Sequence, residues 1–350
     1  MPEPRTIRLI LFADTHLGFD YPVKPRIERR RRGEDFFANH ERVLAHARHV
    51  DADLVVHGGD LFFRSKVPQK IVDLVYESLF EFSKSGIDLF IVPGNHERSR
   101  LPESLLFSLP NVHIFDRPRT VAVEKGGARL GLSGFAFERK EIGSRFSRLV
   151  EETGWRGVEA DVRLLCLHQA VEGARVGPVN FTFRRGPDVI SRRDLPPEFL
   201  ALLCGHIHRQ QILRDRSEPA RTPPAIYPGS IERTSFAEKD EAKGFFDIAI
   251  EPSRGGGWTL TPEFVPLPAR PMVDLVIDER VTAGGLPSFL AEKIARFPAD
   301  AVVRVKSAGR LDGAIAATMT AGFLRKVFPP TMNIQMSAAL FGRSERRRKR

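Results

Sequence analysis

The sequence predicts an α/β fold with two helix-flanked β-sheets, followed by a small α+β domain. Up to residue 96, short apolar runs alternate with helical patterns, as in repeated strand–loop–helix units. From residue 120 to 265, short apolar runs follow one another, which two sheets accommodate better than one open parallel sheet. Prolines at positions 266, 268 and 271 then separate a last segment that has its own strands and helices.

The expected strands of the first part each end in polar residues. We expect strands at Ile7–Ala13, Leu54–His57 and Asp88–Val92. Helices are expected at Asp35–His49 and Gln69–Ser85, because apolar residues recur there at helical spacing. Ligand sites in such sheets lie beyond the carboxyl ends of the strands. The loops after these strands are therefore the expected place for functional residues.

The rest of the chain is expected to hold more strands and a second, smaller domain. The expected strands before the boundary are Thr120–Val123, Ala128–Ser133, Arg163–Leu167, Ala201–Cys204, Gly244–Ile250 and Trp258–Val265. Beyond the boundary we expect strands at Val273–Ile277, Ala301–Ser307 and Asn333–Met336, and helices at Leu286–Phe297 and Gly313–Val327. The expected division is a first domain over residues 1–265, a second over 266–340 and a basic tail over 341–350.

Composition excludes several classes of protein. A hydrophobic share of 42% and a charged share of 28% are close to globular averages and exclude wholesale disorder. No apolar stretch approaches the ~18 residues that span a bilayer, and Leu9–Ala13 is too short for a signal sequence. Two cysteines cannot staple a secreted scaffold. We therefore expect a soluble cytoplasmic protein.

The net charge of +10 is concentrated in two short runs. Arg26–Arg32 contains five arginines and one glutamate, and Arg343–Arg350 contains five arginines, one lysine and one glutamate. Two basic runs on a nearly neutral body suit a polyanionic partner such as nucleic acid, bound at defined places. The alternative is that both runs are solvated surface or disordered ends.

Residues with the chemistry of metal ligands follow five of the expected strands. They are Asp14, His16, Asp60, Asn95, His96, His168, His206 and His208. Carboxylates, an amide and imidazoles without a thiolate suit Mn²⁺, Fe²⁺ or Zn²⁺ better than Ca²⁺, an iron–sulfur cluster or a structural zinc site. Apart from His96, seven ligands are too many for one tetrahedral ion but enough for two ions that share a carboxylate. The pattern predicts a two-metal phosphoesterase.

The order of these motifs resembles the calcineurin-like metallophosphoesterases: Asp-x-His, Gly-Asp, Gly-Asn-His, a later His and Gly-His-x-His. Within that family the chain looks most like the SbcD-type DNA repair exonucleases, counterparts of the meiotic-recombination nuclease. Supporting stretches are residues 13–18, 58–62, 167–169 and 227–233. The resemblance implies a two-sheet sandwich and a C-terminal capping domain.

The resemblance also implies roles for the site residues. One metal would be held by Asp14, His16, Asp60 and His208, and the other by Asp60, Asn95, His168 and His206, so that Asp60 bridges. His96 would contact the scissile phosphate and assist departure of the leaving oxygen. The implied activity is a Mn²⁺-dependent 3′→5′ exonuclease on duplex DNA, with endonuclease activity on single strands or hairpins.

Alternative functions and partners stay open on the sequence alone. Gly-Asn-His-Glu, with Glu97, also occurs in phosphatases of the family, so a phosphatase or phosphodiesterase acting on nucleotides or other small phosphoesters is the second hypothesis. Against a protein phosphatase, the stretch Gly59–Phe63 lacks the arginine-bearing turn that those enzymes carry after this Asp. A non-enzymatic DNA-binding scaffold is the third hypothesis.

The resemblance implies a homodimer. An SMC-like ATPase partner stays open. Family members with such a partner generally carry a further helical segment for docking it, whereas here the cap runs almost directly into the basic tail.

Further candidates concern nucleic acid. Arg29, Arg30, Arg31 and Arg32 are expected to hold phosphates near the cleavage site, and the tail to add non-specific affinity. Phe181, Phe183, Arg184 and Arg185 either stack on bases and contact phosphates or form a loop that packs both phenylalanines into the core. We expect His57 to be structural, and Cys166 and Cys204 to be core residues.

Overall fold

The computed structural model describes residues 5–23, 29–98, 100–102, 109–215, 222–309 and 311–337. The chain forms two compact units, one of residues 1–19 and 35–268, the other of residues 20–34 and 269–350. The second unit thus takes in a segment, 20–34, that was expected in the first domain. The basic tail and Arg26–Glu28 lie outside the described residues.

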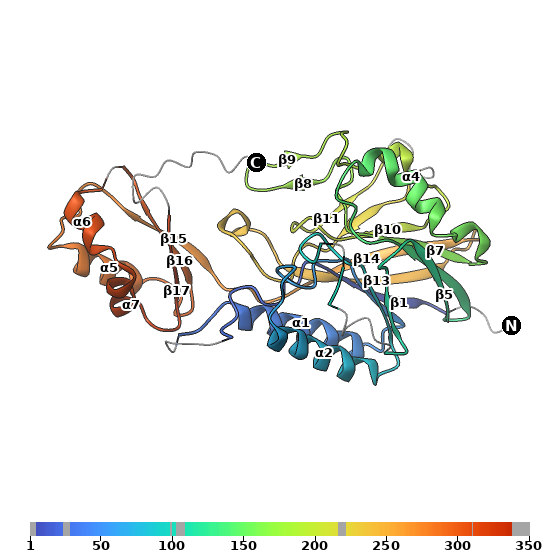
Figure 1. Ribbon diagram of the computed structural model, residues 1–350, viewed down its shortest axis with the longest axis horizontal. Helices are drawn as coiled ribbons and strands as arrows, with labels where there is room; N and C mark the ends of the chain where they lie inside the picture. Colours follow the sequence, from blue (N-terminus) through green and yellow to red (C-terminus); the bar gives the residue numbers. More distant parts are fainter. Residues whose placement is uncertain are drawn as a thin grey trace. The chain divides into compact units, whose positions relative to one another are not determined.

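One six-stranded sheet of the first unit has the order β14-β13-β1-β2-β3-β4. Strands β1 to β4 are parallel, while β13 and β14 run antiparallel to their neighbours. Their bounds are β1 Ile7–Phe12, β2 Leu54–His57, β3 Asp88–Ile91, β4 Val112–Ile114, β13 Gly244–Pro252 and β14 Trp258–Pro266. Helices α1 (Gly33–His49) and α2 (Gln69–Ser83) lie side by side along one face (Figure 1).

The second six-stranded sheet has the order β11-β12-β10-β7-β6-β5. Its strands are β5 Arg119–Lys125, β6 Ala128–Gly134, β7 Val162–Leu167, β10 Ala201–Cys204, β11 Gln211–Leu213 and β12 Ala225–Tyr227. Helix α4 (Ile142–Glu152) packs on this sheet, and β8 (Arg175–Val176) and β9 (Phe181–Thr182) form a separate hairpin. The described part of the unit also has 3₁₀ turns η1 (Trp155–Gly157), η2 (Arg192–Asp194) and η3 (Phe236–Glu238).

Two apolar clusters show that the sheets are layered as a sandwich. One cluster lies between the sheets and joins Leu9 and Val56 of the first to Leu164 and Leu203 of the second. The other lies between the second sheet and α4, and includes Leu165. Consecutive residues of β7 serve the two clusters because successive side chains of a strand point to opposite faces. The predicted two-sheet fold is confirmed, although α4 was not predicted.

The second unit contains a three-stranded parallel sheet, β15-β16-β17, with bounds Met272–Ile277, Val302–Ser307 and Asn333–Met336. Its helices are α5 (Leu286–Ile294), α6 (Gly313–Thr318) and α7 (Ala321–Val327). The single helix expected over 313–327 is wrong. Met319 leaves the helical region at ψ 53°, and Thr320 caps α7 by accepting a hydrogen bond from Phe323 N. Over the described ranges, no helix is both long enough and apolar enough to cross a membrane.

Candidate active site

Five loops of the first unit meet where strands of both sheets end. The loops after β1 and β2 are joined by backbone hydrogen bonds, Asp14 N to Gly59 O at 2.9 Å and His16 N to Asp60 O at 3.0 Å. The loops after β7 and β10 are joined by Gly205 N to Leu167 O at 3.0 Å. Parallel strands deliver their carboxyl ends to one edge, so these loops gather polar residues from distant parts of the sequence.

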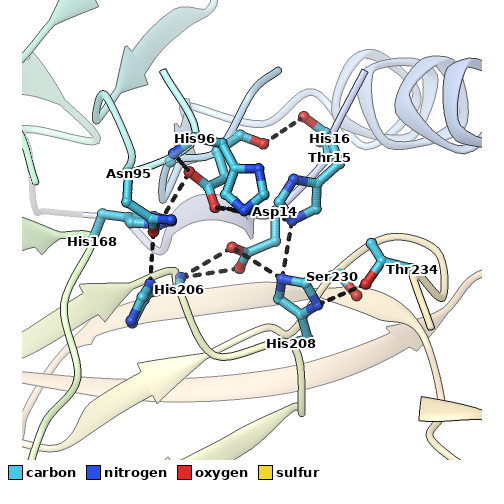
Figure 2. A network of polar contacts seen from close by, with 12 residues as sticks. Asp14, Thr15, His16, Asn95, His96, His168, His206, His208, Ser230 and Thr234 are labelled. Carbon is cyan, nitrogen blue, oxygen red and sulfur yellow. Dashed lines mark hydrogen bonds and ion pairs between the residues drawn. The ribbon is translucent and has the colours of Figure 1, made fainter. Parts of the chain in front are cut away.

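The structure brings all seven predicted metal ligands together with His96. Figure 2 shows His96 among the predicted ligands other than Asp60. Asp60 is central. Its Oδ1 lies 3.4 Å from His168 Nε2, and its Oδ2 lies 3.9 Å from His16 Nε2. The two oxygens of one buried carboxylate therefore face different histidines, an arrangement that suits a carboxylate shared by two ligand groups.

The remaining ligands form a group on each side of Asp60. On one side, His16 Nε2 and His208 Nε2 are 3.0 Å apart, and His208 Nε2 is 3.9 Å from Asp14 Oδ1. On the other side, Asn95 Oδ1 lies 3.0 Å from His168 Nε2 and 2.8 Å from His206 Nδ1. Ligand atoms of Asp14, His16 and His208 lie within 4.8 Å of one another, as do those of Asp14, Asp60 and His168.

Two histidines are oriented by hydrogen bonds at the nitrogen that faces away from the site. His168 Nδ1 donates to Gly58 O at 2.8 Å, and His208 Nδ1 donates to Glu238 Oε1 at 3.2 Å. Each bond holds Nδ1 away from the site and turns Nε2 toward the other predicted ligands. Histidines that bind metals are usually oriented by such a partner.

The backbone at four of the ligands is left-handed. Asp14, His16, Asp60 and His206 have φ values of 52°, 43°, 54° and 84°. Non-glycine residues rarely adopt this region, and such strain concentrates at functional sites, where the surrounding structure must compensate for it. The loops are therefore shaped to aim these side chains and not for local stability.

Glycines allow the loops to approach closely at two points. A Cβ on Gly94 would lie 2.2 Å from Asp60 Oδ1, and a Cβ on Gly59, whose φ is 108°, would lie 2.2 Å from His168 Nδ1. No side chain fits at either position. The glycines before Asp60 and Asn95 therefore permit the close packing of these loops.

Burial and neighbouring charges shift the pKa values of several predicted ligands in opposite directions. Burial lowers the pKa of His206 to about 3 and that of His16 well below its usual value, so both are neutral at neutral pH, the form that binds metals. Burial also lowers the pKa of His168, but the charge of Asp60 and their hydrogen bond outweigh it and raise that pKa to about 9. For Asp60, burial raises the pKa, yet the surrounding histidines lower it overall, so it stays ionised.

The donor set fits two divalent cations. Buried carboxylate oxygens, an amide oxygen and imidazole nitrogens converge without a thiolate, a mixture typical of Mn²⁺, Fe²⁺ and Zn²⁺ sites. Uncompensated, two carboxylates as buried as Asp14 and Asp60 would carry a large desolvation cost. Cations shared between the two groups would offset that cost.

His96 is partly exposed, and its ring has a fixed partner. Its side chain is 34% exposed, against 25% for His208 and 1% for His16. Its Nδ1 donates to Phe63 O at 2.6 Å, and its backbone N donates to Asp60 Oδ1 at 2.9 Å. Its Nε2 lies 3.9 Å from Asp60 Oδ2, so the ring can reach both the metal-binding groups and a substrate.

Three buried ionisable residues behind the ligands were not predicted. Glu97 accepts hydrogen bonds from Phe62 N at 2.5 Å and Gly94 N at 2.9 Å, and so ties together the loops that carry Asp60 and Asn95. Burial and the charge of Asp60 raise the pKa of Glu97 to about 8. Glu238 and Lys243 support His208. Glu97 could have been suspected from its place after His96, but no spacing pattern marks Glu238 or Lys243.

The residues expected to be structural are buried in the way expected. His57 contacts Thr15 Oγ1 at 3.0 Å and accepts a hydrogen bond from Gly59 N at 3.1 Å, which joins the loops after β1 and β2. Cys166 and Cys204 are fully buried members of the two apolar clusters, and burial raises the pKa of both thiols. Tyr227 holds the loop after His168 through Gln169 O and Val171 N.

The predicted nucleic-acid contacts fall in two places. In the second unit, Arg29 donates to the main-chain carbonyls of residues 325, 328, 329 and 332. Arg30 lies 3.5 Å from Asp300, Arg31 pairs with Asp20, and Arg32 is buried. In the first unit, Arg184 and Arg185 are exposed. Whether any of these residues contacts DNA stays a prediction.

Comparison with known proteins identifies the family. The model of the calcineurin-like phosphoesterase family matches residues 7–210, more than half of the chain. The chain belongs to the calcineurin-like phosphoesterase family. The matched range contains every residue of the proposed site, from Asp14 to His208. The resemblance drawn from the motifs is confirmed, and the fold described above is that of this family.

Within this family, the chain is similar to relatives that carry the name of a DNA repair protein. The chain is 28% identical over 268 residues to the DNA double-strand break repair protein Mre11 of Methanopyrus kandleri, a match covering 71% of this chain and 55% of the relative. It is 26% identical over 319 residues to Mre11 of Archaeoglobus fulgidus, covering 86% and 68%. The chain thus spans just over half the length of the first relative. A solved dimetal phosphatase from Danio rerio aligns at a TM-score of 0.43 and 13% identity, covering 75% of this chain and 99% of that one.

Proposed function

We propose that this phosphoesterase is a two-metal DNA nuclease that hydrolyses phosphodiesters in DNA repair. The observation that carries the proposal is the Asp60 carboxylate, whose two oxygens face histidines of two separate ligand groups. The relatives named Mre11 support DNA as the substrate. The proposed activity is Mn²⁺-dependent 3′→5′ exonuclease action on duplex ends, with endonuclease action on single strands or hairpins.

The proposed reaction divides the work between the ligands and His96. Two divalent cations bound by the seven ligands would activate water and neutralise charge on the phosphoryl group. Asp14 is fixed by two hydrogen bonds from His206 N, both 3.1 Å, so the first ligand group is held rigidly to the loop of the second. Such preorganisation means that little rearrangement is needed when the transition state forms.

His96 is placed to act on the substrate itself. Because its Nδ1 proton is donated to Phe63 O, the ring is fixed with Nε2 toward the ligand cluster. From there a protonated Nε2 can donate to a phosphate oxygen and then release its proton to the leaving oxygen. Positioned proton transfer of this kind contributes about 10²–10⁴-fold to rate.

The same proposal covers partners and location. We infer that the second unit contacts DNA as a capping domain, that the chain forms homodimers, and that it works in the cytoplasm at the nucleoid. An ATPase partner stays an open prediction, tested by co-purification with SMC-like ATPases. Sedimentation at several protein concentrations tests the dimer.

The test is a nuclease assay on linear duplex, hairpin and circular single-stranded DNA with Mn²⁺ or Mg²⁺. The wild type should degrade linear duplex with Mn²⁺, and His96→Ala should lose at least about 10²-fold in rate while still binding two ions. A matched control is His113→Ala, since His113 of β4 pairs with Asp88 of β3 and neither belongs to the ligand groups. Intact DNA beside rapid turnover of a nucleoside monophosphate or a small phosphodiester would instead establish a small-molecule phosphoesterase.

A further inference from the structure

The hairpin of β8 and β9 is held to the loop that carries His206 and His208. Arg209, the residue after His208, donates to Asn180 Oδ1 at 2.6 Å and to Gly177 O at 2.7 Å, both at the hairpin turn. Its Nε also lies 3.0 Å from Glu241 Oε1. A movement of the turn would therefore pull directly on the residue next to a metal ligand.

A second link fixes the base of the hairpin to β11. Gln211 Oε1 accepts a hydrogen bond from Arg175 N at 2.8 Å, and Gln211 Nε2 donates to Arg175 O at 2.9 Å. These bonds imitate a strand pairing between β8 and the start of β11. Figure 1 shows β8 and β9 running side by side, apart from the two large sheets. The hairpin is thus an anchored projection beside the site.

The two phenylalanines of the hairpin have different roles. Phe183 packs against the apolar cluster under the second sheet, so it belongs to the core. Phe181 is 58% exposed, and its ring meets Phe183 edge to face, with centroids 5.4 Å apart at 85°. Phe183 therefore supports the Phe181 ring, while much of Phe181 stays open to solvent. An exposed, supported aromatic ring is the element on which unpaired bases stack.

A basic pocket lies at the base of the same hairpin. It has a volume of about 380 Å³ and is lined by Arg175, Arg192, Arg214 and residues of β11. Within the part of the chain that the structure describes, its lining carries these three arginines and no carboxylate. Arg192 Nη2 is buried, makes no hydrogen bond among the described residues and lies 3.7 Å from the Asp215 carboxylate. Such a set of guanidinium groups suits phosphate oxygens.

We propose that the hairpin and this pocket form a binding site for one unpaired DNA strand, with Phe181 stacked on a base and the pocket arginines on backbone phosphates. Arg184 and Arg185, both exposed, extend the positive charge along the hairpin. The inference rests on the proposed function, because it supplies the strand that the metal site would cut. A basic, aromatic surface next to a phosphoesterase centre matches a polyanion with ring faces better than it matches an apolar protein partner.

The decisive experiment varies the ring at position 181 and measures binding of single-stranded oligonucleotides by fluorescence anisotropy. Phe181→Ala should weaken binding at least about fivefold, and Phe181→Trp should restore it because the stacking face returns. Phe181→Leu, which keeps apolar volume without a ring, should resemble Ala. Val179→Ala is the matched control, since Val179 is 85% exposed on the same hairpin but has no ring.

The pocket is tested by the salt dependence of the same binding. Arg175→Gln combined with Arg214→Gln should flatten the plot of log K against log salt by about 0.7 for each phosphate that is no longer neutralised. Hydrolysis of bis-p-nitrophenyl phosphate should stay at the wild-type rate in every variant, since it needs only the metal site. The assay with the small phosphodiester therefore distinguishes failure of the hairpin site from failure of the proposed metal centre.

Three outcomes are distinguishable. If the wild type cleaves DNA and Phe181→Ala binds and cuts single strands as well as the wild type, the hairpin site is wrong and the nuclease proposal stands. If Phe181→Leu restores binding as fully as Phe181→Trp, the ring makes an ordinary apolar contact and stacking is overturned. If the wild type turns over the small phosphodiester but neither binds nor cuts DNA, both proposals fall.

Discussion

Lys243 and Glu238 form a buried ion pair directly behind His208, with Lys243 Nζ 2.7 Å from Glu238 Oε2. The Lys243 side chain is wholly inaccessible, and its ammonium also donates to His208 O and to Ser230 Oγ. Glu238 in turn accepts from His208 Nδ1 and from Thr234 Oγ1. Burial raises the pKa of Glu238, but His208 and Lys243 outweigh it and hold the pKa well below its usual value. The pair therefore fixes both the backbone and the ring of one proposed ligand.

Removing the lysine should be far more damaging than removing a surface lysine. Lys243→Met leaves Glu238 buried without its cation, and we expect the free energy of unfolding to fall by about 3–5 kcal/mol. Lys84→Met, which breaks an exposed pair with Glu81, should cost under about 1 kcal/mol. Urea denaturation measures both. Equal, small losses would show that the buried pair contributes little.

Glu238→Gln keeps the volume of the side chain but removes the charge that faces His208 and Lys243. The amide still fills the space, but the acceptor at His208 Nδ1 becomes weaker, and outer partners of metal-binding histidines typically contribute about 10–100-fold to metal affinity. We expect Mn²⁺ binding by calorimetry to weaken by about that factor at one of two sites. Unchanged affinity at both sites would show that Glu238 does not orient a ligand.

Gly94→Ala tests the close approach of two loops. The new Cβ would lie 2.2 Å from Asp60 Oδ1, so Asp60 or the loop after β3 must move. We expect loss of bound metal and of phosphodiester turnover, even if the chain still folds. Gly157→Ala is the control, because a Cβ there meets nothing within 4 Å. Metal binding equal in the two variants would show that the loops can shift without harm.

Arg29 should stabilise the second unit. Its guanidinium donates to carbonyls of Pro329 at 2.9 Å and Met332 at 2.7 Å, and burial lowers its pKa. Arg29→Ala leaves these acceptors unsatisfied, and we expect the second unit to lose about 1–3 kcal/mol in thermal denaturation. Arg31→Ala, whose partner is the partly exposed Asp20, should lose less than about 1 kcal/mol. A loss of DNA affinity from Arg31→Ala without a loss of stability would support the predicted phosphate contact.

The lowered pKa of Asp274 predicts that the second unit loses stability at acidic pH. Burial raises its pKa, but Arg304 on the neighbouring strand and Lys306 outweigh it and lower the pKa to about 2. Because this pKa is below the unfolded value, the carboxylate stabilises the fold above about pH 4, and the contribution disappears as the pH falls toward about 2. We expect about 1 kcal/mol, after screening by solvent. Asp274→Asn should be less stable at neutral pH and lose less stability than the wild type on acidification through this window, which calorimetry can measure.

The strands and the ligands could be predicted because both follow from local patterns. β2 and β10 are short apolar runs, and the polar residues that follow them stand at the carboxyl ends of parallel strands, where topology alone brings them together. Residues with metal-ligand chemistry at the ends of five strands were therefore enough to predict the site, although the sequence gives no distances.

The rest depends on contacts between distant residues. Lys243 donates to the main-chain carbonyl of His208, 35 positions away in the sequence. Nothing in the sequence around either residue indicates this contact. Segment 20–34 belongs to the second unit because Arg29 donates to the carbonyl of Pro329, which lies 300 positions later in the sequence. The helix expected over 313–327 is divided at Thr320 because a side-chain cap competes with helical continuity. Phe181 and Phe183 stand on the same short hairpin, yet one is exposed and the other packs, which only the packing could decide.

The most direct test of the two-metal centre counts the metal ions on the folded chain. We predict two Mn²⁺ ions per chain by inductively coupled plasma mass spectrometry after equilibration and desalting. We also predict that Asp60→Asn, which weakens the shared carboxylate, lowers occupancy at both sites. One ion per wild-type chain, or loss of a single ion in Asp60→Asn with the second held at full affinity, would contradict a centre bridged by Asp60.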